Sequence, residues 1–295
     1  MRKHFLFALT LVLTIALVAC GGSSTPASGV DDGGGSGGQT TPRVQPTQPS
    51  AGSGTGRFAP SSNMGGRRQE HGITLLQDGR VLVAAGVDAG GANHNKAIHN
   101  TAEIYDPASG TWSETGMLNE TRYEMVLLTL QDGRVLVAGG RTVLTFATSG
   151  AEVWDPATGV WTPTGSMLHE RDFFEGVVLQ DGRVMVFGGF GTEYGMQETT
   201  EIWDPATGEW APGPNMSEAR AAHTVTLLQD GRVLIAGGGK VDPPYSNTAE
   251  IYDPATGSFS PAGELSRGRQ EHTATLLQDG RVAVVGGRGR RTEVE

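Results

Sequence analysis

The chain has a single cysteine, Cys20, among its 295 residues, so no disulfide can form within one copy. Basic side chains are also few: 22 lysines and arginines stand against 32 aspartates and glutamates, which gives a formal net charge of −10. An acidic protein repels nucleic acid and anionic lipid headgroups. We therefore expect no nucleic-acid partner and no basic patch that would hold the chain on a membrane.

A strongly apolar stretch is missing everywhere except at the N-terminus. Arg2 and Lys3 precede an apolar segment, residues 5–19. This segment is shorter than the ~20 residues that a membrane-spanning helix needs, and it has the form of a secretory signal peptide. We therefore assign residues 1–19 to a signal peptide and expect an exported protein.

The end of this segment, Leu-Val-Ala-Cys at residues 17–20, resembles a bacterial lipobox. The resemblance implies that Cys20 becomes the first residue of the mature protein and carries lipids that anchor it to the cell envelope. Gly21 implies the outer membrane where there are two membranes. The alternative is an ordinary signal peptide followed by a chance cysteine. Residues 20–56 are mostly Gly, Ser, Thr, Pro and Gln, a composition that predicts a disordered tether.

From about residue 57 the sequence becomes repetitive. A Gln-Asp-Gly-Arg-Val motif begins at Gln77, Gln131, Gln180, Gln229 and Gln278. A second motif, Glu-aliphatic-aromatic-Asp-Pro, begins at Glu103, Glu152, Glu201 and Glu250. The second motif recurs every 49 residues, and the first does so after one longer step of 54. A period near fifty predicts a propeller-type repeat.

Each repeat predicts four strands. In the fourth repeat these are residues 223–229, residues 232–238, residues 248–253 and a last strand around Phe259. The Asp-Gly pair between the first two predicts a two-residue type I′ turn, and Asp-Pro-Ala-Thr-Gly predicts the turn before the last.

Three marks resemble the kelch family: a Gly-Gly pair that closes the second strand, a Tyr or Trp ahead of a Trp or Phe, and a basic residue before the first strand. The resemblance covers residues 57–295 and implies an all-β fold, a β-propeller of four-stranded blades. It implies little about activity, because one fold hosts many functions.

The spacing of residues before the first repeat also predicts how the ring of blades closes. Phe58 and Met64 lie 152 residues before Trp210 and Met216, so the segment between them predicts an isolated fourth strand. Residues 272–278, 281–287 and 292–295 would supply the other strands of a composite blade, which gives five blades closed by a latch between the two termini. The alternative is a chain truncated inside its fifth blade.

One basic residue recurs three positions before each first strand: Arg68, Arg122, Arg171, Arg220 and Arg269. The kelch resemblance places this segment at the mouth of the central channel. Guanidinium groups there would clamp a carboxylate or phosphate, with Glu70, Glu124 and Glu271 beside them. The alternative is that each arginine pairs with backbone carbonyls or a neighbouring acid. The variable loops after the second strands indicate either specificity or drift.

We expect a binding or scaffolding module for a protein or an acidic glycan, without cofactor or metal. The alternative is a carbohydrate enzyme that resembles the kelch-type sialic acid mutarotases, with Glu70, Glu124 or Glu271 moving protons. A galactose-oxidase-like copper enzyme is excluded, because that family needs a cysteine cross-linked to a tyrosine and Cys20 is assigned to the anchor. His94 and His99 match no standard zinc spacing.

Overall fold

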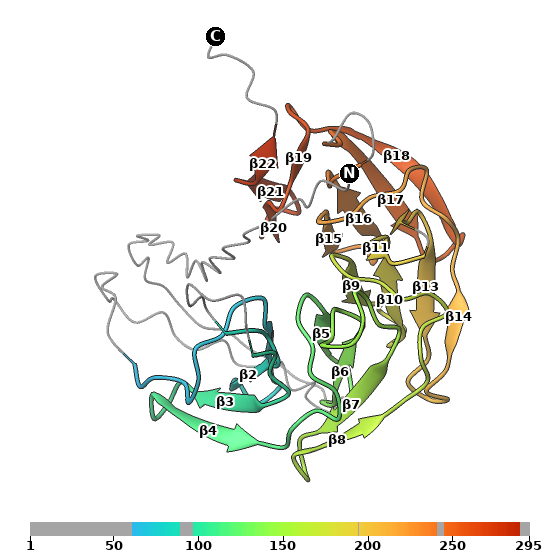
Figure 1. Cartoon of the computed structure of the whole chain (residues 1–295). Helices are drawn as coiled ribbons and strands as arrows, with labels where there is room; N and C mark the ends of the chain where they lie inside the picture. Colours follow the sequence, from blue (N-terminus) through green and yellow to red (C-terminus); the bar gives the residue numbers. More distant parts are fainter. Residues whose placement is uncertain (1–60, 89–96, 194, 241–244, 290–295) are drawn as a thin grey trace, which may run out of the picture. The chain divides into compact units, whose positions relative to one another are not determined.

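The computed structural model describes residues 61–88, 97–193, 195–240 and 245–289. The predicted signal peptide, Cys20, the tether, Phe58, His94 and the last six residues lie outside these ranges. Within them every regular element is a β-strand (Figure 1). The described residues contain no helix that is long and apolar enough to cross a membrane.

Four complete antiparallel sheets follow one another along the chain, as the repeat predicts (Figure 1). Blade 1 contains β1 (Gly72–Leu75), β2 (Val81–Ala84), β3 (Ala102–Asp106) and β4 (Thr111–Thr115). Blade 2 contains β5 (Val126–Thr129), β6 (Val135–Ala138), β7 (Ala151–Asp155) and β8 (Val160–Pro163). Blade 3 contains β9 (Glu175–Val178), β10 (Val184–Phe187), β13 (Thr200–Trp203) and β14 (Trp210–Pro212). Blade 4 contains β15 (Thr224–Leu227), β16 (Val233–Ala236), β17 (Thr248–Asp253) and β18 (Ser258–Glu264).

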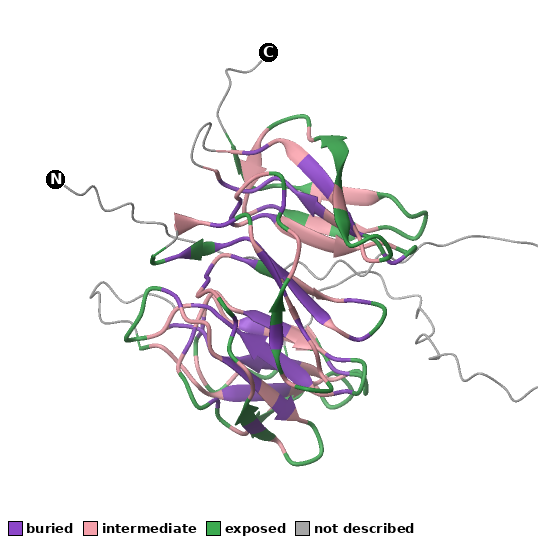
Figure 2. Cartoon of the chain, turned by 90° about the vertical axis from the view of Figure 1, so that its right-hand side faces the viewer, coloured by how far each residue is buried: buried purple, intermediate pink, exposed green. Residues whose placement is uncertain are grey.

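The strands of each blade are joined in the order of the sequence, and the first strands β1, β5, β9 and β15 contact one another in turn. The all-β fold of four-stranded blades is therefore confirmed. The hydrophobic core lies between neighbouring blades: Leu82 of blade 1 packs in one cluster with Trp154 of blade 2, and Phe187 of blade 3 packs with Ile235 of blade 4. Figure 2 shows these buried residues concentrated in the strands of the complete sheets.

The Asp-Gly turn has a different geometry from the one predicted. In blade 1 the amide of Gly79 donates to the carbonyl of Leu76 (3.0 Å), and of the turn residues only Gly79 has positive φ, at 88°. This is a three-residue hairpin with a glycine bulge, so the two-residue type I′ turn is wrong. Asp78 accepts from the backbone and side chain of Arg80, which explains why Asp-Gly-Arg recurs as a unit.

The fifth unit is incomplete in the described residues. It has β20 (Thr273–Leu276) paired with β21 (Val282–Val285), and a short pair formed by β19 (Arg269–Gln270) and β22 (Arg288–Gly289). Val285 is 64% exposed, whereas its counterpart Ala236 in blade 4, where the third and fourth strands are present, is 2% exposed. In blade 1, Leu75 is also 64% exposed.

The segment before blade 1 bears on the predicted latch. The amide of Ser62 donates to the carbonyl of Gly110 (3.3 Å). Gly116 and Gly165, which follow the fourth strands of blades 1 and 2, make the equivalent bond to the next blade. Ser62 therefore has the position of a residue that follows a fourth strand. Phe58 and residues 292–295 are outside the described residues, so the five-bladed latch stays a prediction.

Candidate binding site

Four of the five repeated arginines are buried inside their own blades. Arg171 is fully buried, and its Nη1 donates to the carbonyls of Gly188 (2.6 Å) and Thr199 (3.1 Å). Its Nη2 lies 2.6 Å from Oε1 of Glu201 on β13. Both terminal nitrogens are thus occupied by the protein.

Blades 1, 2 and 4 repeat this arrangement. The guanidinium–carboxylate pairs, with their N–O distances, are Arg68–Glu103 (2.6 Å), Arg122–Glu152 (3.0 Å) and Arg220–Glu250 (2.7 Å). In each pair the glutamate opens the second sequence motif. The expectation that these four arginines clamp a ligand is therefore corrected, because their donors are used inside the blade. Arg269 donates to the carbonyl of Gly286 (2.8 Å).

The sequence carried a signal for these pairs. Arg122 and Glu152 are 30 residues apart, and the same separation holds for the pairs at residues 171 and 201 and at residues 220 and 250. The alternative to a ligand was that an acid near each arginine in the sequence balances its charge. The acids that do so come from the third strand.

The residue two positions after each arginine has an unusual backbone. Its φ is positive in all five repeats: Glu70 (55°), Glu124 (57°), Phe173 (48°), Ala222 (51°) and Glu271 (55°). Left-handed backbone is uncommon for residues other than glycine. Hydrogen bonds between blades hold it: Glu124 N to Glu70 O (3.1 Å), Ala222 N to Phe173 O (2.8 Å) and Glu271 N to Ala222 O (2.9 Å).

These turns surround a cavity to which all five repeats contribute, and which we call the axial cavity. It measures about 160 Å³ and is lined by Glu70, His71, Glu124, Met125, Phe173, Phe174, Glu175, Ala222, His223, Glu271 and His272. The three predicted glutamates therefore share one cavity. Glu175 and the histidines are additional lining residues that the sequence analysis did not single out.

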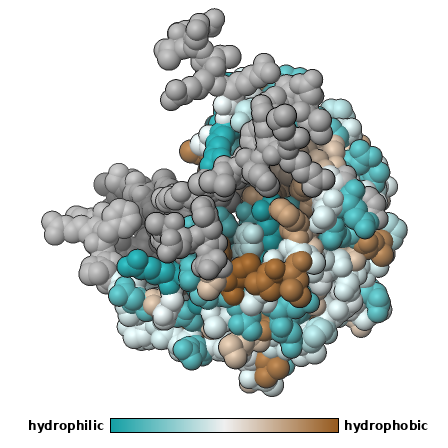
Figure 3. Space-filling model, viewed as in Figure 1, coloured by the Kyte–Doolittle hydropathy of each residue, from teal (hydrophilic) through white to brown (hydrophobic). Residues whose placement is uncertain are grey.

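A second cavity of about 290 Å³, the outer cavity, adjoins the first through Phe173, Ala222 and Glu271. Its other lining residues are Arg141, Phe190, Met196, Ala221, Gly239 and Gln270. We refer to the axial and outer cavities together as the cup. Exposed apolar side chains lie on the loop after β6, with Phe146 70% exposed. Figure 3 shows apolar residues gathered near the middle of one face, next to hydrophilic ones.

Arg141 is the residue that sequence reasoning missed. It lies just after the Gly-Gly pair of blade 2, and its Nε lies 3.1 Å from Oε2 of Glu124 and also contacts Asp172. Its guanidinium carbon is 5.0 Å from the centre of the Phe173 ring. The residue after the Gly-Gly pair differs among repeats, and in blade 3 it is Phe190. A variable residue directly after a repeated motif was the feature of the sequence that could have identified Arg141.

Burial dominates the electrostatics of the axial cavity. It raises the pKa of Glu124 to about 8, against the opposing effect of Arg141. The pKa of Asp172 rises to about 6 for the same reason. Burial lowers the pKa of His223 to about 3 and that of His272 to about 4, so both imidazoles are neutral at pH 7.

The described residues contain no group of three or more His, Cys, Asp or Glu side chains arranged to hold a metal ion. His99 instead lies 2.8 Å from Asp88 through Nε2 and Oδ1. Its sequence neighbour His94 is outside the described residues.

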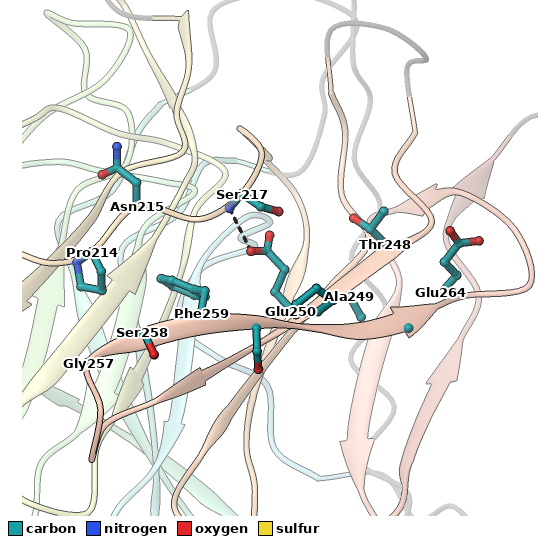
Figure 4. A pocket seen from close by; sticks show the side chains of 13 residues that line it. Pro214, Asn215, Ser217, Thr248, Ala249, Glu250, Gly257, Ser258, Phe259 and Glu264 are labelled. Carbon is teal, nitrogen blue, oxygen red and sulfur yellow. Dashed lines mark hydrogen bonds between the residues drawn. The ribbon is translucent and has the colours of Figure 1, made fainter.

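A larger cleft of about 630 Å³ lies along β18 and is lined by Pro214, Ser217, Phe259 and Glu264, among others (Figure 4). Its central acid is Glu250, which accepts from the amide of Ser217 (2.9 Å) and pairs with Arg220. Because that carboxylate already binds protein groups, the cleft has fewer polar groups that could bind a ligand than the cup has.

Comparison with known proteins agrees with this geometry. The kelch motif matches residues 127–168, 176–217 and 220–266. The chain is a kelch-repeat β-propeller. Among solved structures, the kelch propeller is similar to one titled "Structure of YjhT", with a TM-score of 0.64 and 16% identity over 77% of this chain and 79% of that chain. At this identity the likeness shows the fold alone. No curated protein matches the sequence.

Proposed function

We propose that the kelch propeller is a glycan-binding module displayed at the cell envelope, with the ligand seated in the cup. The observation that carries the proposal is the combination of the Phe173 ring with Arg141, Glu271 and Gln270 around adjoining cavities. A sugar ring has an apolar face that packs on an aromatic ring and hydroxyls that need polar partners. The cup offers both.

The charges of the cup alter the expected ligand. Glu70, Glu124, Glu175 and Glu271 line the cup and Asp172 lies beside it, and the guanidinium groups of Arg141 and Arg288 pair with three of these five carboxylates. An excess of negative charge disfavours a sialic or uronic acid. We therefore propose a glycan without a carboxylate, in place of the acidic glycan expected from the arginines.

Display at the envelope rests on the N-terminal sequence. The lipobox-like residues 17–20 and the tether that follows would hold the propeller at a distance from the membrane. Several acyl chains anchor a protein stably where a single one does not. The membrane is thus proposed as a partner only through the lipid on Cys20.

The test is a glycan array with the full chain, followed by calorimetry on the best neutral or basic glycan. Phe173→Ala should weaken binding by about tenfold, since stacking on the ring is lost. Ala222 shows that alanine fits the same backbone position in the next blade. Arg183→Ala, at an exposed turn far from the cup, should bind as wild type does. Absence of any glycan ligand, or full affinity in Phe173→Ala, would refute the proposal.

One observation favours a second candidate, a carbohydrate enzyme that moves protons. Glu124 has its pKa raised to about 8 and lines the axial cavity beside Arg141, and a group that titrates near neutral pH suits general acid–base catalysis. The test is the rate at which the bound sugar exchanges its anomers. An enzyme would lose roughly 10²–10⁴-fold in rate in Glu124→Gln while still binding the sugar. A rate equal to that in buffer supports the binding module.

A further inference from the structure

We propose that the axial cavity binds an ammonium group, so that the ligand of the cup is an amino sugar with a free amine. This inference rests on the proposed glycan-binding function and names the chemical class of the glycan.

The first observation is the isolated carboxylate of Glu175. It opens β9, the first strand of blade 3, and lines the axial cavity. Uncharged residues occupy the same position in the other repeats: Gly72, Val126, Thr224 and Thr273. Glu175 is exposed in β9, and in the described part of the chain no ion pair or hydrogen bond compensates its carboxylate. A carboxylate in this setting lacks a counter-charge.

The other carboxylates near Glu175 do not leave an unpaired cation that could serve as its counter-charge. Glu124, with a side chain 7% exposed, shares Arg141 with Asp172, and Glu271 lies 3.0 Å from Arg288. Glu70 lines the same cavity, so the acids outnumber the two guanidinium groups when all of them are ionised. A positive ligand would reduce the repulsion among them.

The second observation, independent of the acids, is the unused hydrogen-bonding capacity of the histidines. His223 is 2% exposed and lines the axial cavity, and neither of its ring nitrogens has a partner in the described residues. The Nδ1 atoms of His71 and His272 also lack a well-aligned hydrogen bond, although a backbone group of Arg68 or Ala236 lies near each ring. Buried polar atoms in proteins are nearly always hydrogen-bonded, so these nitrogens indicate a missing partner.

The two observations specify the same partner. A neutral imidazole presents one acceptor nitrogen, and a carboxylate presents only acceptors. The pKa of each of the three histidines is lowered, with burial as the largest cause, so the rings are neutral. An ammonium group has three donors and no acceptor, which complements the acceptor nitrogens of the rings and the carboxylate oxygens. A sugar hydroxyl would satisfy the imidazoles but would leave Glu175 uncompensated.

The dimensions fit an amine attached to a sugar. The axial cavity, at about 160 Å³, holds on the order of five water volumes, which is enough for an ammonium group and the carbon that carries it. The sugar ring would then lie in the outer cavity, which measures about 290 Å³, against Phe173.

The experiment titrates the full chain with glucosamine, glucose, N-acetylglucosamine and glucuronic acid at pH 7 and follows binding by calorimetry. Glucosamine should bind about tenfold or more tightly than glucose and N-acetylglucosamine, because only it carries the charge. Glu175→Gln should remove that preference. Glu209→Gln, which deletes the same charge at an exposed turn of the same blade, should keep the preference.

The outcomes separate the two proposals. If none of the sugars binds and the glycan array is empty, the glycan-binding function is wrong. If sugars bind but glucosamine has no advantage, or Glu175→Gln retains it, the function stands and the ammonium site is wrong. Should Glu175→Gln fail to fold, Glu175→Thr replaces it, since Thr224 and Thr273 occupy the equivalent positions in blades 4 and 5.

Discussion

The buried arginine–glutamate pairs predict a large loss of stability when one partner is removed. In Arg171→Met the apolar side chain fills much of the same space, but Glu201 loses the guanidinium 2.6 Å away. The carboxylate is 1% exposed and keeps the amides of Leu168 (2.6 Å) and His169 (3.0 Å) as donors. The carbonyls of Gly188 and Thr199 each lose a hydrogen bond as well.

Removing one member of a buried ion pair costs about 3–5 kcal/mol, because it leaves an uncompensated buried charge. For a domain of this size that corresponds to a fall in melting temperature of roughly 6–20 °C. The measurement is urea denaturation and thermal melting followed by circular dichroism. Arg171→Met/Glu201→Gln should recover part of the loss, because the buried charge is gone.

Arg183→Met is the matched control. Arg183 pairs with Asp181 at 2.7 Å in the same blade, but the two side chains are 42% and 48% exposed. Exposed pairs contribute about 0–1 kcal/mol, so this variant should melt close to wild type. The reasoning fails if Arg171→Met is as stable as Arg183→Met, which is the result expected of an arginine that waits for an anionic ligand.

Three further predictions concern other parts of the chain. Cys20→Ala should move the protein from the detergent phase to the aqueous phase in a detergent partition; an aqueous wild type would exclude the anchor. Deleting residues 57–66 should lower the melting temperature well below that of a chain lacking residues 21–56, since Ser62 bonds to Gly110 and the predicted latch strand is lost; equal melting would exclude the latch. Burial raises the pKa of Glu124 from 4.5 to about 8, so the folded state holds a proton that the unfolded state releases, and stability should fall by roughly 1–2 kcal/mol as pH rises from 6.5 to 8. Glu124→Gln should flatten that fall in chemical denaturation, and an unchanged slope would contradict the raised pKa.

The fold was predictable because the same pattern of strands and turns recurs in five repeats of the sequence. Motif spacing located the strands of blade 4, which the structure confirms at β15, β16, β17 and β18. The hairpin was wrong in detail, because Asp-Gly fits both a type I′ turn and a glycine bulge. Only the hydrogen bond between Gly79 and Leu76 separates the two.

The site was less predictable, because its residues come from positions where the repeats differ. Glu70, Glu124 and Glu271 were found because they follow a repeated arginine. Glu175 occurs once, and Arg141 recurs only as Arg288 in the fifth repeat, with Val87, Phe190 and Gly239 at the equivalent positions. A single sequence does not distinguish such a residue from drift until the ring brings it beside its neighbours.

The arginine–glutamate pairs also bear on how such a ring can grow. Each arginine and its glutamate belong to the same repeat, including blade 1, where an insertion widens their separation to the 35 residues between Arg68 and Glu103. A tandem duplication of 49 residues therefore copies a complete arginine–glutamate pair together with the strands that the pair connects. A new blade would need no compensating change in its neighbours to keep its buried charge balanced. Residues such as Phe173 and Ala222 line the cup and take no part in the arginine–glutamate pair. They are then free to differ from blade to blade.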